Sequence, residues 1–181
     1  QLAENIKTAF NEKWFNYETA SYNTGTQAEN GIPLDYGMVP EGYEERVAEN
    51  IAKDVTEHDN HLTAGEVGLN PMFKSLSEYG YADLVYKMMM NETQPSYYFF
   101  VQQNRTTLPE EWNGSASQNH FMLGLGEEWL FNYLGGIRND GIAYDKSIIA
   151  PFLQEDINYA DVSVRTRYGK LSSKWVGNGK G

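Results

Sequence analysis

Apolar residues recur at helical spacing along roughly the first 135 positions of the chain. The clearest case is an apolar stripe with charged residues on the opposite side, formed by Tyr43, Val47, Ile51 and Val55. A stripe with a period near 3.6 residues predicts an amphipathic helix that buries one face. Similar stripes occur elsewhere, and together they predict seven helices at about 2–14, 26–33, 40–57, 65–79, 81–91, 96–103 and 117–135.

Start and stop signals support several of these helices. Thr26 and Glu29 have the spacing of a capping box, in which each side chain bonds the backbone of the other residue. The helix that begins at this capping box is expected to be kinked or broken near Pro33, because proline removes a backbone donor. Pro40 is expected to open the third helix, and Gly80 to end the fourth. The first helix has no cap before it, so we expect the chain to be part of a longer protein.

The periodicity changes to two near the end of the chain. Residues 147–152 are typical of a strand, and alternating residues on either side of Tyr168 and Gly169 predict a hairpin. A lone hairpin is only marginally stable in water. The sequence therefore predicts a helical domain over residues 1–140 and the opening strands of a β domain over residues 141–181.

Composition excludes several classes of function. The formal net charge is −11, whereas nucleic acids and anionic membrane surfaces attract basic proteins, so neither is an expected partner. The chain has no cysteine, which excludes disulfides and thiolate metal sites. No apolar run reaches the roughly 20 residues of a membrane-spanning helix. Gln1 is not a natural start, so a signal peptide could have been removed, and we expect a periplasmic or extracellular protein.

A polar segment over residues 106–120 is the best candidate for chemistry. Its Gly, Ser and Asn residues predict a loop, and aromatic runs flank it on both sides. It contains two carboxylates, an indole and an imidazole, at Glu110, Glu111, Trp112 and His120. Such a combination on a loop suits a catalytic site better than a packing role.

The same segment carries a family resemblance. Residues 106–112, Thr-Thr-Leu-Pro-Glu-Glu-Trp, are followed by Asn-His at 119–120. This pattern resembles the signature of the bacterial α-L-rhamnosidases of glycoside hydrolase family 78, which usually reads Thr-Thr-[Leu/Ile]-Trp-Glu-x-Trp before Asn-His. Pro109 stands where most members have Trp. Further segments that resemble the family extend the match over nearly the whole chain, at 60–68, 82–86, 95–97 and 128–137.

The resemblance implies a fold and an activity. The fold would be mainly α: the second half of an (α/α)₆ barrel followed by the first strands of a C-terminal β-sandwich. The parent enzyme would remove terminal α-L-rhamnose from glycosides or polysaccharides with inversion and without a cofactor. Glu110 would be the general base, His120 would bind the sugar, and Trp112 would form part of the pocket wall. Glu111 is expected to be solvated or structural.

The resemblance also implies that something is missing. The family's general acid lies in a segment that precedes the region matched here, and no part of this sequence corresponds to it. An inverting hydrolase needs that acid to protonate the leaving oxygen. We therefore expect the isolated chain to be inactive and its partner to be the missing N-terminal half of the barrel.

Other interpretations stay open at this point. The helix count alone allows an irregular bundle, and the enzyme could be another (α/α)₆ glycosidase or a lyase. A non-catalytic carbohydrate-binding module is an alternative from a different class. His58, Asp59 and His61 superficially resemble a metal cluster, but a spacing of three without a further ligand is a weak signal, and no metal site is expected. Glu66 and Arg105 could line the mouth of the barrel, although both residue types are more often structural, and neither Glu66 nor His61 is assigned a role.

Overall fold

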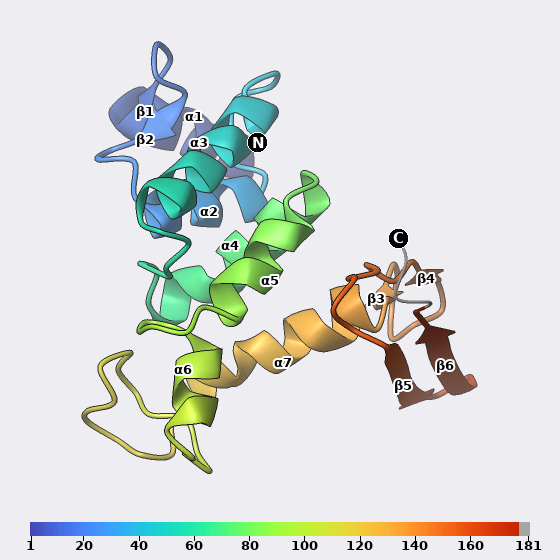
Figure 1. The fold of residues 1–181 in the computed structure, drawn as a ribbon. Helices are drawn as coiled ribbons and strands as arrows, with labels where there is room; N and C mark the ends of the chain where they lie inside the picture. The colour runs from blue at the N-terminus through green and yellow to red at the C-terminus, as the bar shows by residue number, and fades with distance from the viewer. Residues whose placement is uncertain (178–181) are drawn as a thin grey trace. The chain divides into compact units, whose positions relative to one another are not determined.

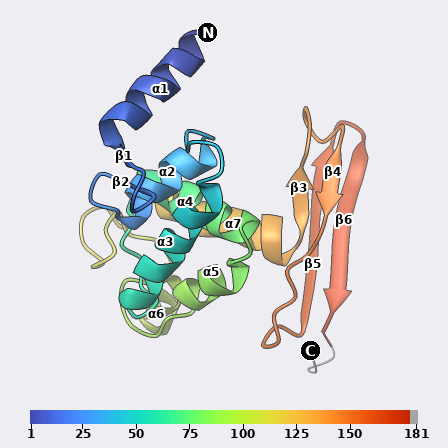
Figure 2. The same cartoon turned by 90° about the horizontal axis from the view of Figure 1, so that it is seen from above.

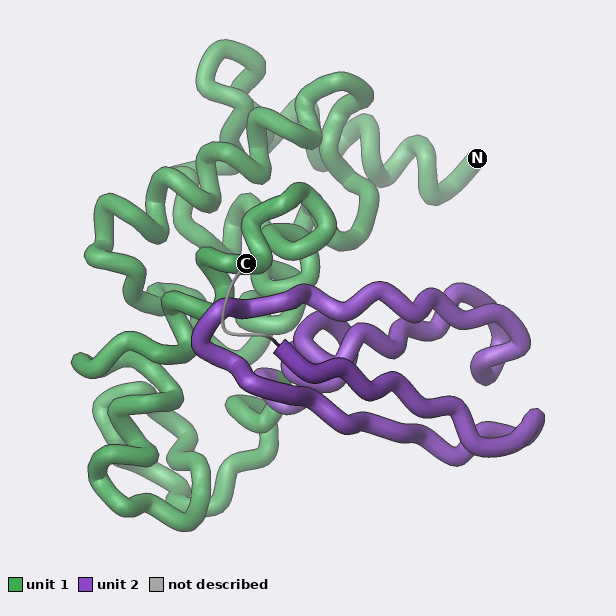
Figure 3. The backbone as a smooth tube through the Cα atoms, turned by 45° about the vertical axis from the view of Figure 1, so that its right-hand side comes forward, with its two compact units in different colours: residues 1–125 green, residues 126–181 purple. Residues whose placement is uncertain are grey.

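The structure is a computed structural model, and it describes residues 1–177. The chain forms two compact units, residues 1–125 and 126–181 (Figure 3). Unit 1 is mainly helical, as Figure 1 shows, and contains α1 (Leu2–Trp14), β1 (Phe15–Asn16), β2 (Ser21–Tyr22), α2 (Gln27–Asp35), α3 (Glu44–Glu57), α4 (Glu66–Glu78), α5 (Ala82–Met89) and α6 (Tyr97–Gln102). It ends with the short turn η1 (Phe121–Gly124). The predicted boundary between residues 140 and 141 stays a prediction.

The core of unit 1 forms around α3, α4 and α5. Most of the predicted stripe is buried, with Val47, Ile51 and Val55 of α3 at 0% exposure, whereas Tyr43 is the half-buried N-cap residue. The start of this helix was predicted wrongly, because α3 begins at Glu44 rather than at Pro40. Pro40 instead opens a turn in which the Tyr43 N–H donates to the Pro40 carbonyl.

Helices α2 and α4 approach each other closely because of glycine. A Cβ atom added at Gly68 would lie 2.5 Å from the Cβ of Ala28, and one at Gly31 would lie 3.0 Å from the Cα of Met72. The capping box predicted for α2 is present, with both reciprocal bonds made by Thr26 and Glu29. Pro33 lies inside α2, which ends two residues later at Asp35.

Helix α1 buries little of its apolar stripe against the rest of unit 1. Leu2, Ile6 and Trp14 are 74%, 55% and 42% exposed, and Asn11 is the helix's buried residue. The Asn11 amide donates to the Met38 carbonyl at 2.8 Å. Figure 2 shows α1 extending away from the other helices of the unit.

The segment predicted as the seventh helix differs from its prediction more than the other helices do. Its start is expected near Ser117 or Asn119, but it begins at Phe121, as the 3₁₀ turn η1. It continues as α7 (Leu125–Trp129) and ends in a π-helical turn, η2 (Leu130–Leu134). The preceding residues cannot join the helix, because the backbones of Ser117 and His120 already bond to the loop before them.

Within residues 126–177, unit 2 contains two small antiparallel sheets. Strands β5 (Tyr159–Thr166) and β6 (Gly169–Val176) form the predicted hairpin, with Tyr159 opposite Val176. The strand predicted over 147–152 is shorter, β4 (Ser147–Ile149), and it pairs with β3 (Ile137–Asn139), which was not predicted. Within residues 1–177, no helix is both long and apolar enough to cross a membrane.

Candidate active site

The segment over residues 106–120 forms a loop that is closed at its base by backbone hydrogen bonds. The Glu110 N–H donates to the Ser117 carbonyl at 2.8 Å, and the His120 N–H donates to the Leu108 carbonyl at 2.9 Å. Both ends of the loop are thereby held together. This pairing places Glu110 and His120 next to each other although nine residues separate them in the sequence.

Arg105 supports the same loop from its N-terminal end. Its guanidinium donates to the Gln118 side-chain oxygen at 2.8 Å and to the Gly114 carbonyl at 3.4 Å. Gly114 has a φ of +84°, and a Cβ there would lie 2.5 Å from the guanidinium. Glycine at this position therefore gives both the turn and the room that Arg105 needs.

Trp112 anchors the loop to unit 1. Its indole N–H donates to the Ala64 carbonyl at 3.1 Å. Its ring stacks on Phe100, with centroids 6.0 Å apart, and meets Tyr97 edge-on at 5.3 Å. The indole thus connects the loop both to α6 and to the segment before α4. Its predicted contact with a sugar stays a prediction.

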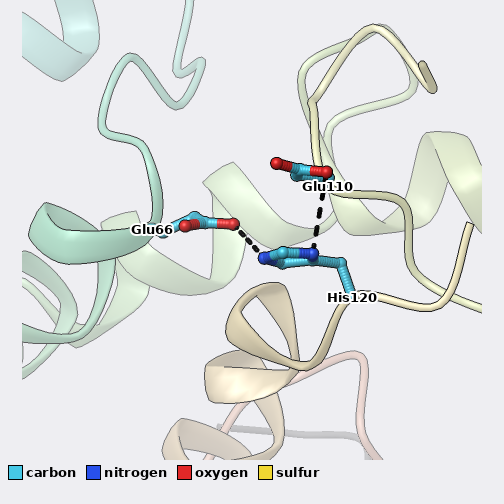
Figure 4. A group of neighbouring side chains, drawn as sticks. All are labelled: Glu66, Glu110 and His120. Carbon is cyan, nitrogen blue, oxygen red and sulfur yellow. Dashed lines mark ion pairs between the residues drawn. The ribbon is translucent and has the colours of Figure 1, made fainter. Parts of the chain in front are cut away.

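The loop brings Glu110 and His120 together with a third residue, Glu66, as Figure 4 shows. His120 Nε2 lies 2.5 Å from Glu66 Oε1, and His120 Nδ1 lies 3.8 Å from Glu110 Oε2. The side chains are 23%, 30% and 42% exposed for His120, Glu66 and Glu110. The imidazole therefore has a carboxylate at each nitrogen, and the more accessible carboxylate is that of Glu110.

The two adjacent glutamates of the loop point to different partners. The Glu110 carboxylate accepts a bond from the Ser117 N–H at 3.2 Å, and Pro109, just before it, is buried. Glu111 accepts bonds from the Ser115 hydroxyl at 2.6 Å and from the Asn113 amide at 3.0 Å. The Ser115 and Asn113 bonds lower the pKa of Glu111. Glu111 therefore stabilises the turn of the loop, in agreement with the expected structural role.

Glu66 is the member of this group to which sequence reasoning gave no role. It is the first residue of α4, directly after the N-cap Gly65. A helix N-terminus favours a carboxylate electrostatically, so the residue has an ordinary explanation from sequence alone. Its contact with His120 depends on the tertiary fold, which brings α4 beside the loop.

Two groups of side chains have residue types that bind metals: the three residues of the candidate site, and the group of His58, Asp59 and His61. Glu66, Glu110 and His120 each offer a ligand atom, and these atoms lie within 4.8 Å of one another. However, the two carboxylates face different ring nitrogens, so a single ion bound through one nitrogen would give up the other contact. In the turn after α3, His61 Nδ1 lies 2.8 Å from the His58 carbonyl and Nε2 lies 2.7 Å from the Thr93 hydroxyl. Both of its nitrogens are therefore engaged by protein groups.

Comparison with known proteins gives a consistent result. Residues 1–134 match the model of the bacterial α-L-rhamnosidase six-hairpin glycosidase domain. An α-L-rhamnosidase of Formosa agariphila is 29% identical over 185 residues, which cover 96% of this chain and 20% of that protein. The chain thus spans about a fifth of the length of this curated relative.

Solved structures of α-L-rhamnosidases are similar to this chain in fold. The crystal structure of Streptomyces avermitilis α-L-rhamnosidase complexed with L-rhamnose superposes with a TM-score of 0.92 at 21% identity, covering 98% of this chain and 18% of that one. The structure of α-L-rhamnosidase from Dictyoglumus thermophilum gives a TM-score of 0.90 at 31% identity, covering 98% and 21%. The chain is thus similar in fold to one continuous part of much larger proteins.

Proposed function

Because this chain belongs to the family of bacterial α-L-rhamnosidase six-hairpin glycosidase domains, we propose that the protein that carries it hydrolyses terminal α-linked L-rhamnose. The substrates would be rhamnose-containing glycosides or polysaccharides. Relatives and structural neighbours named as α-L-rhamnosidases support this substrate class. The chain spans only about a fifth of their length, so the activity belongs to the larger protein.

Glu110 is the general base in this proposal. Its carboxylate is the most accessible of the three clustered side chains at 42% exposure, so a water molecule can reach it. The Ser117 N–H fixes one of its oxygens at 3.2 Å. In an inverting hydrolase such a carboxylate removes a proton from water, which then attacks the sugar from the face opposite the leaving group. This placement of Glu110 beside His120 is the observation that carries the assignment.

Glu66 is not the second carboxyl group of an inverting pair. The two carboxyl groups of such a pair stand about 6.5–9.5 Å apart, because a water molecule and the sugar lie between them. The nearest ligand atoms of Glu66 and Glu110 lie within 4.8 Å, and the imidazole of His120 contacts both residues. As the family resemblance implies, the general acid would come from a segment outside these 181 residues, and the chain alone would be inactive.

His120 and Trp112 complete the proposed site. His120 Nδ1 faces Glu110 rather than Glu66, which leaves this nitrogen for a sugar hydroxyl or the attacking water. Trp112 would contribute to the pocket wall while its indole N–H holds Ala64. Residues 1–140 would be the second half of an (α/α)₆ barrel that packs against a missing first half, and residues 141–181 would be the start of a β-sandwich. The predicted export of the protein remains part of this proposal.

The decisive experiment replaces the base. Glu110→Gln keeps the shape of the side chain but cannot accept a proton, so we expect kcat on an aryl α-L-rhamnoside to fall by about 10²–10⁴-fold. Binding of L-rhamnose, measured by calorimetry, should persist. Nuclear magnetic resonance of the first product should show the β anomer. All three measurements use the protein that carries this chain.

Glu111→Gln is the matched control. Its amide oxygen can still accept the bonds from Ser115 and Asn113, so the rate should stay near normal. A normal rate in Glu110→Gln would remove the assignment of the base. Cleavage of another aryl glycoside in a panel, but not of the rhamnoside, would assign the site to a different glycosidase.

A further inference from the structure

The environment of Glu66 shows a carboxylate that depends on one imidazole. Its Oε1 atom is buried and has no hydrogen-bond partner of good geometry within residues 1–177. Its close contact is the ion pair with His120 Nε2 at 2.5 Å. A buried carboxylate oxygen without a charged or hydrogen-bonding partner is costly, so the imidazole and the carboxylate stabilise each other.

This contact determines which nitrogen of His120 faces the base. The two nitrogens of an imidazole are distinct, and the partner of one decides what the other can do. Because Nε2 is paired with Glu66, the other nitrogen, Nδ1, is the one that points toward Glu110 at 3.8 Å. That distance is longer than a hydrogen bond and leaves Nδ1 available to a water molecule or a hydroxyl between the two groups.

Few of the other groups beside the imidazole can fix the rotation of its ring. Phe121 stacks beside the ring with centroids 6.0 Å apart, but Phe121 itself is 84% exposed. The backbone of His120 is held by Leu108, which fixes the Cα atom and not the rotation of the ring. Glu66, on the first turn of a regular helix of 13 residues, is the rigid group that fixes the ring.

We propose that Glu66 is a positioning residue for the reaction: it holds His120 so that Nδ1 faces the carboxylate of Glu110. The inference rests on the proposed function, because it assumes that Glu110 acts on water. Glu66 touches neither the sugar nor the water in this proposal and acts through His120. The arrangement is analogous to hydrolase sites in which a carboxylate fixes the orientation and tautomer of a catalytic histidine.

The test is a double-substitution cycle in the protein that carries this chain. Glu66→Gln should lower kcat on an aryl α-L-rhamnoside by about 10–100-fold, the range of coupling between residues in direct contact, with KM changed less than about threefold. His120→Ala should lower kcat as well. The double variant should be no slower than His120→Ala alone, because Glu66 acts through the imidazole. Glu66→Asp keeps the charge and should recover part of the loss.

A matched control lies on the same helix. Glu78 is exposed at the far end of α4, and Glu78→Gln should leave kcat unchanged. Additive losses from Glu66→Gln and His120→Ala would overturn the inference, since the two residues would then act independently. Loss of activity in a chelator with recovery in Zn²⁺ would also overturn it, because the three side chains would be metal ligands.

The outcome separates this inference from the proposed function. If Glu110→Gln is inactive while Glu66→Gln has a normal kcat, the positioning role is wrong and the base assignment stands. If Glu110→Gln is fully active on the rhamnoside, the assignment of the base fails, and the positioning role fails with it. Thermal unfolding of each variant shows whether the fold is retained, and a loss of kcat at unchanged unfolding temperature supports the positioning role.

Discussion

Tyr22 and Asn11 form a buried polar pair that connects α1 to the rest of unit 1. The Tyr22 hydroxyl donates to Asn11 Oδ1 at 2.7 Å, and the two residues are 2% and 6% exposed. Burial raises the pKa of Tyr22 above its ordinary value, so the hydroxyl keeps its proton and remains a donor at neutral pH. The pair is one of the few specific contacts of α1.

Removing the hydroxyl should therefore destabilise the protein. We expect Tyr22→Phe to lower the free energy of unfolding by about 1–3 kcal/mol, because the oxygen of Asn11 is left buried and unpaired. Urea unfolding of the protein that carries the chain measures this change. Tyr36→Phe is the control, since Tyr36 is 71% exposed and its hydroxyl can bond water. Equal stability of both variants would contradict the prediction.

At this scale the sequence predicted part of the candidate site. Glu110 and His120 belong to one loop, and a family-like motif marks both, so their proximity could be expected. Glu66 lies in another element, and its position after Gly65 is equally typical of an ordinary helix start. No local pattern indicates that its partner is His120, because that contact is made only when α4 packs beside the loop.

Among the elements, α2 depends on its N-terminal capping box. The Glu29 carboxylate accepts bonds from Thr24, Asn23 and the Thr26 backbone. Partial burial works against the ionised form, but these bonds outweigh it and lower the pKa of Glu29 to about 2. A depressed pKa in the folded state adds stability above the unfolded value, and this stability is lost as the pH falls toward the folded value.

The expected consequence is a stability difference that depends on pH. Glu29→Gln should be less stable than the unchanged protein by about 1 kcal/mol at pH 6, a value reduced for the exposure of the group. The difference should shrink between pH 4.5 and about 2, where the carboxyl group becomes protonated. Urea unfolding across this pH range measures it. Thr24→Val removes one of these bonds and should also make stability depend less on pH. A stability difference between the unchanged protein and Glu29→Gln that stays constant over this pH range would argue against this account of Glu29.

The sequence predicted long periodic elements better than short ones. The stripe of α3 and the alternation of β5 and β6 extend over several turns or residue pairs, so each leaves a clear signal. Strands β1 and β2 have two residues each, too few for any period to show. The late start of the seventh helix was also invisible, because Ser117 and His120 bond across the loop rather than along the chain.

At the scale of the whole molecule, the exposed apolar face of α1 predicts self-association of the isolated chain. Leu2 and Ile6 are 74% and 55% exposed, and an apolar stripe of this kind usually packs against another element. We expect the 181-residue chain to form oligomers in analytical ultracentrifugation. Replacing both residues with serine should reduce them, whereas replacing the exposed polar Lys13 with serine should not. A monodisperse monomer that unfolds cooperatively would contradict the proposal of a missing barrel half.

The closed base of the loop has a consequence for how such a site can diversify during evolution. The backbone bonds between Glu110 and Ser117 and between Leu108 and His120 lie below the tip at residues 113–116. An insertion at the tip lengthens a segment whose ends are already joined, and doubling a loop costs only about 0.6 kcal/mol. New side chains can therefore be introduced at the tip while Glu110 and His120 stay in place, so the selectivity of the proposed enzyme is free to change while the proposed base is retained.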